Sequence, residues 1–206
     1  MAHRILGVIL VTIVLALQAC APKAQTDCGY VQNSYGERIS WKGQLPVSLQ
    51  IHQSVPDQFI PAIKAAVDTW NSNAGTTVFV IAGDHYAGNP ANQDQVNVIS
   101  FSPTWDPNLL SEQAKTQVYW IGDQIQEADV KVNASSVNGN PVYQFYSDTE
   151  IPNAINIQAL LLHELGHVLG LKHIDGVGSV MATYLANDAN RTSLASVDVS
   201  NLKCEY

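Results

Sequence analysis

The amino-acid sequence predicts a single α+β domain that follows an export segment. The chain of 206 residues, 46% hydrophobic and 14% charged, has the length and composition of one globular domain. Its first two thirds hold short β-branched or alternating apolar runs, which are typical of strands. A long apolar segment with helical spacing follows them, and no internal repeat is evident.

The elements follow from apolar periodicity. A first helix is expected where apolar residues recur every three to four positions, and its start has two interpretations. Ser54 with Asp57 resembles a capping box, whereas Pro61 fits the first turn of a helix. In chain order we expect strands at 45–51, 76–81, 95–101, 118–121 and 127–133, a loop at 83–94, and helices within 54–73, 154–169 and 193–204.

The last two expected strands form a pair joined by a turn at Gly122 and Asp123. The segment Glu127–Asn133 alternates well, with Ala128, Val130 and Val132 on one face and polar residues on the other. This alternation indicates a strand with one face in water, at a sheet edge.

The first residues predict export. A basic start at His3 and Arg4 precedes an apolar stretch too short to span a bilayer, as in a secretory signal. The stretch ends Leu-Gln-Ala-Cys at Cys20, which resembles the lipid-attachment motif of bacterial lipoproteins. The resemblance implies a signal at 1–19, a lipid-anchored segment at 20–42 and the domain at 43–206. Ala21 resembles the sorting pattern for an outer membrane, where one is present. Simple secretion that leaves Cys20 free is the alternative.

Charge and cysteines limit the partners. A net charge of −8 and scattered basic residues argue against nucleic acid as a partner. We expect a monomer. With Cys20 lipid-modified, Cys28 and Cys204 form an even pair in an oxidising compartment, and a disulfide between them is expected.

The run HELGHVLGLKH, residues 163–173, has the spacing of a catalytic zinc site. His163 and His167 lie one turn apart on a helix face, so both can bind one metal ion. Glu164 can face a metal-bound water, and Gly170 lets the chain turn back to bring in His173. Three protein ligands leave one position open, which distinguishes catalytic from structural zinc. The alternative is a buried helix that carries histidines by chance.

These residues resemble the metzincin class of zinc peptidases, and within it the matrixin family, best its bacterial members. Ser179-Val180-Met181 resembles the Met-turn, in which a methionine lies beneath the zinc ligands; an ordinary core methionine is the alternative. The resemblance implies a twisted mixed five-stranded sheet, a backing helix, an active-site helix and a C-terminal helix. Calcium sites are common in the family, but the loop aspartates form no recognisable calcium motif. A Cys28 that binds the zinc, as in latent family members, lacks the surrounding motif.

The implied function is a zinc-dependent endopeptidase for extended polypeptides. Zinc held by the three histidines would activate water and polarise the scissile carbonyl, and Glu164 would act as general base. By analogy with the family, the substrate adds as a strand to 127–133, so Ala128, Val130 and Tyr184 are expected at the cleft. Asp175 could orient a histidine or simply cap the backbone. A lipid-anchored binding module with vestigial zinc, or a hydrolase of other amides, are the competing functions.

Overall fold

The computed structural model describes residues 23–91, 93–175, 178–184, 186 and 190–206. The expected signal segment and the expected lipid attachment at Cys20 lie outside these residues. Among the described residues, no helix has the length and apolar character needed to cross a lipid bilayer.

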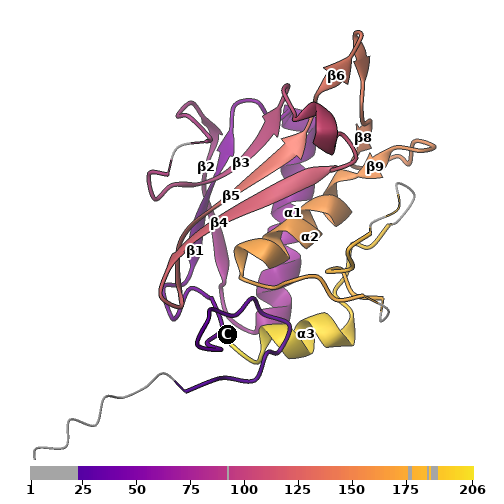
Figure 1. The fold of residues 1–206 in the computed structure, drawn as a ribbon. Coiled ribbons are helices and arrows are strands. Elements are labelled where there is room, and N and C mark those ends of the chain that lie inside the picture. Colours follow the sequence, from indigo (N-terminus) through magenta and orange to yellow (C-terminus); the bar gives the residue numbers. More distant parts are fainter. Residues whose placement is uncertain (1–22, 92, 176–177, 185, 187–189) are drawn as a thin grey trace, which may run out of the picture.

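A mixed five-stranded sheet forms one layer of the domain (Figure 1). Its strand order is β2-β1-β3-β5-β4, and all neighbours run parallel except β4, which is antiparallel to β5. The prediction of a mixed sheet with five strands is therefore confirmed. The strands are β1 (Val47–His52), β2 (Phe79–Tyr86), β3 (Asn97–Ser102), β4 (Ala114–Ile121) and β5 (Gln124–Asn133).

Helices form the second layer, and the apolar core lies between them and the sheet (Figure 1). Helix α1 (Ile60–Ala74) contacts β2 and α2, and α2 (Ile157–Val168) contacts β4 and β5. Helix α3 (Ser196–Leu202) closes the domain beside α1. Helices α2 and α3 lie within their predicted segments, and α1 extends one residue beyond its predicted segment 54–73. Short strand pairs join β6 (Ser136–Val137) to β7 (Asn140–Pro141) and β8 (Phe145–Tyr146) to β9 (Ile155–Asn156).

The start of α1 follows one of the two sequence interpretations. Pro61 lies in the first turn, and Phe59 is the N-cap with no side-chain hydrogen bond. The capping-box interpretation is wrong because the Ser54 hydroxyl does not cap the helix. It accepts a hydrogen bond from the backbone N–H of Phe101 on β3 at 2.9 Å. Asp57 instead begins the short 3-10 turn that precedes the helix.

Strand β2 begins and ends later than the sequence suggests. It starts at Phe79 and continues to Tyr86 through a segment expected as loop. The register between β1 and β2 shifts twice, so the pairing continues past Gly83 and past His85, whose φ is 64°. These irregularities remove the simple alternation on which strand prediction rests.

Strand β5 is an inner strand, so the predicted sheet edge at 127–133 is wrong. It pairs with β3 on one side and β4 on the other. Its polar face is covered as well as its apolar face, because Glu127 accepts the backbone N–H of Gln95 and Asp129 accepts that of Val98. Both carboxylates are buried. The free edge of the sheet next to β5 therefore belongs to β4.

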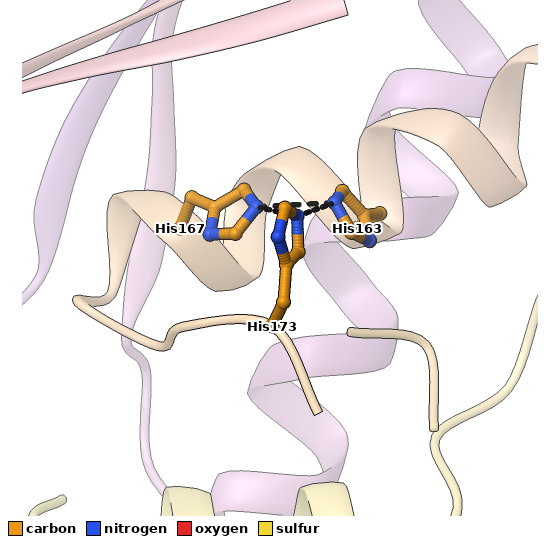
Figure 2. Close-up of side chains that lie close together, drawn as sticks. All are labelled: His163, His167 and His173. Atoms are coloured by element: carbon orange, nitrogen blue, oxygen red, sulfur yellow. Dashed lines mark hydrogen bonds between the residues drawn. The ribbon is translucent and has the colours of Figure 1, made fainter. Parts of the chain in front are cut away.

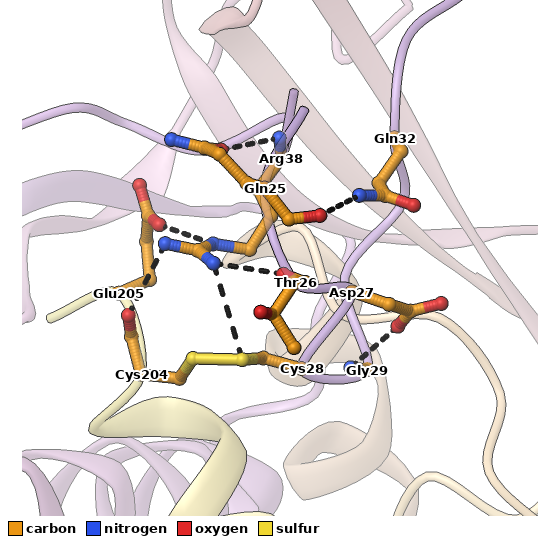
Figure 3. Close-up of a disulfide and its surroundings, with 9 residues drawn as sticks. All are labelled: Gln25, Thr26, Asp27, Cys28, Gly29, Gln32, Arg38, Cys204 and Glu205. Carbon is orange, nitrogen blue, oxygen red and sulfur yellow. Dashed lines mark hydrogen bonds and ion pairs between the residues drawn. A yellow bond between two sulfur atoms is a disulfide. The ribbon is translucent and has the colours of Figure 1, made fainter. Parts of the chain in front are cut away.

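Residues 28–41 are an integral part of the fold, although the sequence placed the domain start at residue 43. Tyr30, Ile39 and Trp41 are buried in the core, and the Trp41 indole N–H donates to the carbonyl of Val168 at 2.8 Å. A disulfide joins Cys28 to Cys204 and holds the segment beside the C-terminus (Figure 3). The expected disulfide is thereby confirmed.

Around that disulfide, Arg38 ties the two ends of the chain together (Figure 3). Its Nε donates to Oε2 of Glu205 at 2.6 Å, and Nη1 donates to the carbonyl of Thr26 at 2.8 Å. These charged groups are largely shielded from solvent, which strengthens the pairing relative to an exposed ion pair. The N-terminal segment is thus fixed by covalent and ionic contacts at the same place.

Candidate metal centre

Helix α2 and the turn after it bring three histidines together. Asn156 caps the helix by accepting the N–H of Ala159 at 3.0 Å, and His163 and His167 follow one turn apart on one face. The chain then reverses at Gly170, whose φ is 96°. A Cβ at this position would also overlap the carbonyl oxygen of Ile39. Both the positive φ and this close contact therefore require glycine. The reversal places His173 opposite the helix.

The three Nε2 atoms point toward one another (Figure 2). The His163–His167 distance is 3.0 Å, the His167–His173 distance is 3.1 Å and the His163–His173 distance is 3.3 Å. Nitrogens that share a tetrahedral zinc ion at about 2.0–2.1 Å are roughly 3.4 Å apart. The triangle therefore has nearly the size that one zinc ion needs.

Backbone carbonyls set the protonation of two of these rings. Nδ1 of His163 lies 2.7 Å from the oxygen of Val180, and Nδ1 of His167 lies 2.8 Å from the oxygen of Leu171. Because a carbonyl can only accept, each Nδ1 carries the proton and each Nε2 presents a lone pair. Burial lowers the pKa of both histidines to about 4, so they are neutral at pH 7. Neutral imidazoles with converging lone pairs repel one another unless a cation lies between them.

The donor set fits zinc at a catalytic site. Among the described residues, these three histidines are the group of His, Cys, Asp and Glu side chains whose ligand atoms lie close enough to hold one ion. Three nitrogen donors without a fourth protein ligand leave a position for water or substrate. Cys28 is not available as a ligand because it is bonded to Cys204.

Glu164 lies on the same helix, beside the open side of the triad. Its side chain is buried, and the Thr116 hydroxyl on β4 donates to Oε2 at 2.6 Å. In the described part of the chain no hydrogen bond engages Oε1 of Glu164. Burial raises the pKa of Glu164, while the Thr116 hydrogen bond and the nearby His167 oppose that rise. A carboxylate with one fixed and one free oxygen can accept a proton from a water molecule at the centre.

The segment at Met181 supports the triad from below. Met181 is fully buried, and a Cβ at Gly166 on α2 would overlap its sulfur atom. The methionine thus packs directly against the helix between the two histidine positions. The carbonyl of the preceding residue, Val180, orients His163. The role of Met181 as a floor beneath the zinc ligands stays a prediction that this packing allows.

Asp198 on α3 fixes this floor. The carboxylate is fully buried and accepts hydrogen bonds from the Ser179 hydroxyl, from the Val180 N–H at 3.0 Å and from the Ala195 N–H at 2.8 Å. The C-terminal helix is therefore linked through Val180 to the ring of His163. The sequence indicated Asp198 only as part of the closing helix and gave no sign of this connection.

A cavity of about 550 Å³ opens over the triad. It runs along β4. Residues of β4 and the loop before it, of α2, of the turn after α2 and of the segment after Met181 line it: Glu112, Ala114, Lys115, Thr116, Val118, Trp120, Leu160, Leu171, Ala182, Thr183 and Tyr184. Tyr184 lines the cavity as predicted and is 78% exposed. Ala128 and Val130 do not line it, because both are buried in the core on the inner strand β5. The strand that lines the cavity is β4.

Asp175 and the two described histidines outside the triad, His52 and His85, have structural partners. Asp175 accepts both the N–H and the hydroxyl of Thr183, at 2.8 and 2.9 Å, so it caps the backbone beside the cavity and does not orient a histidine. His85 lies 2.9 Å from Asp57, and His52 lies 2.8 Å from Ser54. None of these belongs to the metal centre.

Two cavity residues were missed by sequence reasoning. Thr116 precedes the apolar run that marked the expected strand, and Glu112 lies in the loop before it. Neither position carries a motif. Recognising that the strand pair begins at Ala114 would have placed Thr116 on the face that turns toward α2.

The sequence model of one protein family, matrixin, matches residues 68–206. The match covers most of the chain and includes the three histidines, Glu164 and Met181. Matrixins are zinc-dependent peptidases. Comparison with curated proteins gives no match.

Proposed function

Because this chain belongs to the matrixin family, we propose that it is a zinc endopeptidase that cuts extended polypeptides. The observation that carries the proposal is the convergence of three histidine Nε2 atoms beside Glu164 in an open cavity. The donor set suits zinc, and the adjacent carboxylate suits a general base.

The edge of β4 offers a binding surface for an extended chain. In the described structure β4 pairs with β5 on one side and with no strand on the other. Five of its residues line the cavity, so a peptide added to this edge would pass over the triad: Ala114, Lys115, Thr116, Val118 and Trp120. Main-chain hydrogen bonds would hold the peptide largely independently of its sequence, and pockets for its side chains would set specificity.

The chemistry divides between the metal and the chain. When bound, zinc would supply the Lewis acidity that makes water a nucleophile and polarises the scissile carbonyl. Glu164 would accept a proton from the attacking water at Oε1 and deliver it to the leaving amine. Thr116 would hold the other oxygen in place, so the base does not turn away from the water.

Zinc analysis with a cleavage assay tests this function. The purified protein should hold one zinc ion per chain and cut an unfolded protein, and a chelator should abolish cleavage. Glu164→Gln should keep zinc and lose hydrolysis, whereas His173→Ala should lose both. Zinc without cleavage of any peptide would indicate a binding module, and undiminished cleavage by Glu164→Gln would exclude the assigned base.

We further propose that the chain is exported and that a lipid on Cys20 anchors it in a bacterial cell envelope. The disulfide between Cys28 and Cys204 supports export, because disulfides persist in oxidising compartments. Labelling with a fatty-acid analogue should mark the wild-type protein and leave Cys20→Ala unmarked. A soluble, unlabelled wild-type protein with a new N-terminus would contradict the anchor.

A further inference from the structure

Glu112 lines the wall of the cavity, and one oxygen of its carboxylate has no hydrogen-bond partner among the described residues. It lies between the 3-10 turn Pro107–Leu109 and β4, and it lines the cavity together with Thr116 and Glu164. Its Oε2 is buried and has no hydrogen-bond partner among the described residues. A buried carboxylate oxygen without a donor is costly, so this arrangement calls for a ligand that supplies one.

The protein itself does not neutralise this group. No described lysine, arginine or histidine forms an ion pair with Glu112. Lys115 also lines the cavity, yet it makes no ion pair with Glu112. The other carboxylate of the cavity, Glu164, offers no positive charge either. Glu112 lines the same cavity as Glu164 and the three histidines, so a side chain held by Glu112 would lie near the metal centre.

The rest of the cavity suits the stem of a long cationic side chain. Leu160 from α2 and Ala182 and Tyr184 from the segment after Met181 give it apolar walls. Lysine and arginine combine an aliphatic stem, which packs on apolar surface, with a terminal cation that donates several hydrogen bonds. A purely aliphatic side chain would fill the walls and leave Oε2 of Glu112 without a donor.

We propose that Glu112 is a specificity-determining residue, and that the substrates are polypeptides with lysine or arginine at a position adjacent to the scissile bond. The inference rests on the proposed peptidase function and adds the class of side chain that the cavity selects. Glu112 would touch the substrate side chain and take no part in bond breaking.

Paired peptides that differ only in lysine or norleucine test this selection, because the two side chains share a stem and differ in the charge. Each position flanking the cut is varied in turn, and kcat/KM is measured for each pair. At one position the wild type should prefer lysine by roughly tenfold or more, the effect of a shielded ion pair. Glu112→Gln should bring the ratio near one, and Glu112→Lys should favour glutamate. The matched control Glu150→Gln, an exposed position outside the cavity, should keep the lysine preference.

A binding measurement separates this proposal from the peptidase function. Zinc-loaded Glu164→Gln should bind the lysine peptide more tightly than the norleucine peptide, and adding Glu112→Gln should remove the difference. If no peptide is cut but this binding difference is present, the peptidase function fails and the pocket assignment stands. Equal wild-type rates at every position, equal binding, or a lysine preference that survives Glu112→Gln would overturn the role of Glu112.

Discussion

The hydroxyl of Thr116 lies 2.6 Å from Oε2 of Glu164 and joins the cleft strand to the active-site helix. Replacing it with valine keeps the shape and removes the donor. Since a hydrogen bond to a charged group contributes about 1.5–3 kcal/mol, we expect kcat to fall by roughly tenfold or more. Zinc content, measured by mass spectrometry of the metal, should not change. Thr116→Ser should restore most of the rate; equal losses in the valine and serine variants would point to packing as the cause.

Gly166→Ala should destabilise the protein although alanine ordinarily favours a helix interior. The added Cβ would overlap the sulfur of buried Met181, and overpacking of a core typically costs about 1–3 kcal/mol. Denaturant unfolding measures the effect. Combining Gly166→Ala with Met181→Ala should cost less than the sum of the single changes, because the second removes the clash. Additive costs would show that the two residues do not compete for the same space.

Asp198→Ala should weaken metal binding at a distance from the metal. The variant leaves the Ser179 hydroxyl and the Val180 N–H without their acceptor, and Val180 orients His163. We expect a loss of stability of about 2–4 kcal/mol and weaker zinc binding in competition with a chelator. Asp198→Asn keeps one acceptor, so its stability and zinc affinity should lie between those of the wild type and those of Asp198→Ala. Wild-type zinc affinity in a folded Asp198→Ala protein would contradict the connection.

Asp129 should make stability fall as pH rises. Burial raises the pKa of Asp129 to about 7 and the charge of Glu127 adds to it, whereas the hydrogen bond from Val98 opposes the rise. From about pH 4 to about pH 7 the folded carboxyl keeps a proton that the unfolded one has lost, so the folded state binds more protons and raising the pH lowers its stability. The slope is on the order of 1 kcal/mol per pH unit. Asp129→Asn should show a smaller decline in unfolding free energy over this range, and an unchanged decline would show that other groups cause it.

The metal centre could be predicted from the sequence because its geometry is local. His163, His167 and His173 lie within eleven residues, and helical spacing with one glycine turn suffices to bring them together. The position of the cleft strand could not be predicted, since it depends on strand order. Alternation in 127–133 is equally compatible with an edge and with an inner strand whose polar face is covered. Here Glu127 and Asp129 accept loop N–H groups, and these contacts have no signature in the sequence.

Thr116 and Glu112 were missed for a related reason. They approach the metal centre only because β4 crosses α2, and the loop and strand that carry them are separated from Glu164 by about fifty residues. Contacts between distant segments follow from packing and leave no periodic signal.

The contact between Gly170 and Ile39 also limits when this part of the fold can form. Residues 28–41 leave the ribosome well before their partners at Gly170, Leu171 and Cys204 are made. These contacts span most of the chain, and such distant pairings form slowly. The fully linked N-terminal segment can therefore form only after Cys204 has been made. A chain interrupted before its last helix would leave the histidine cluster without its support.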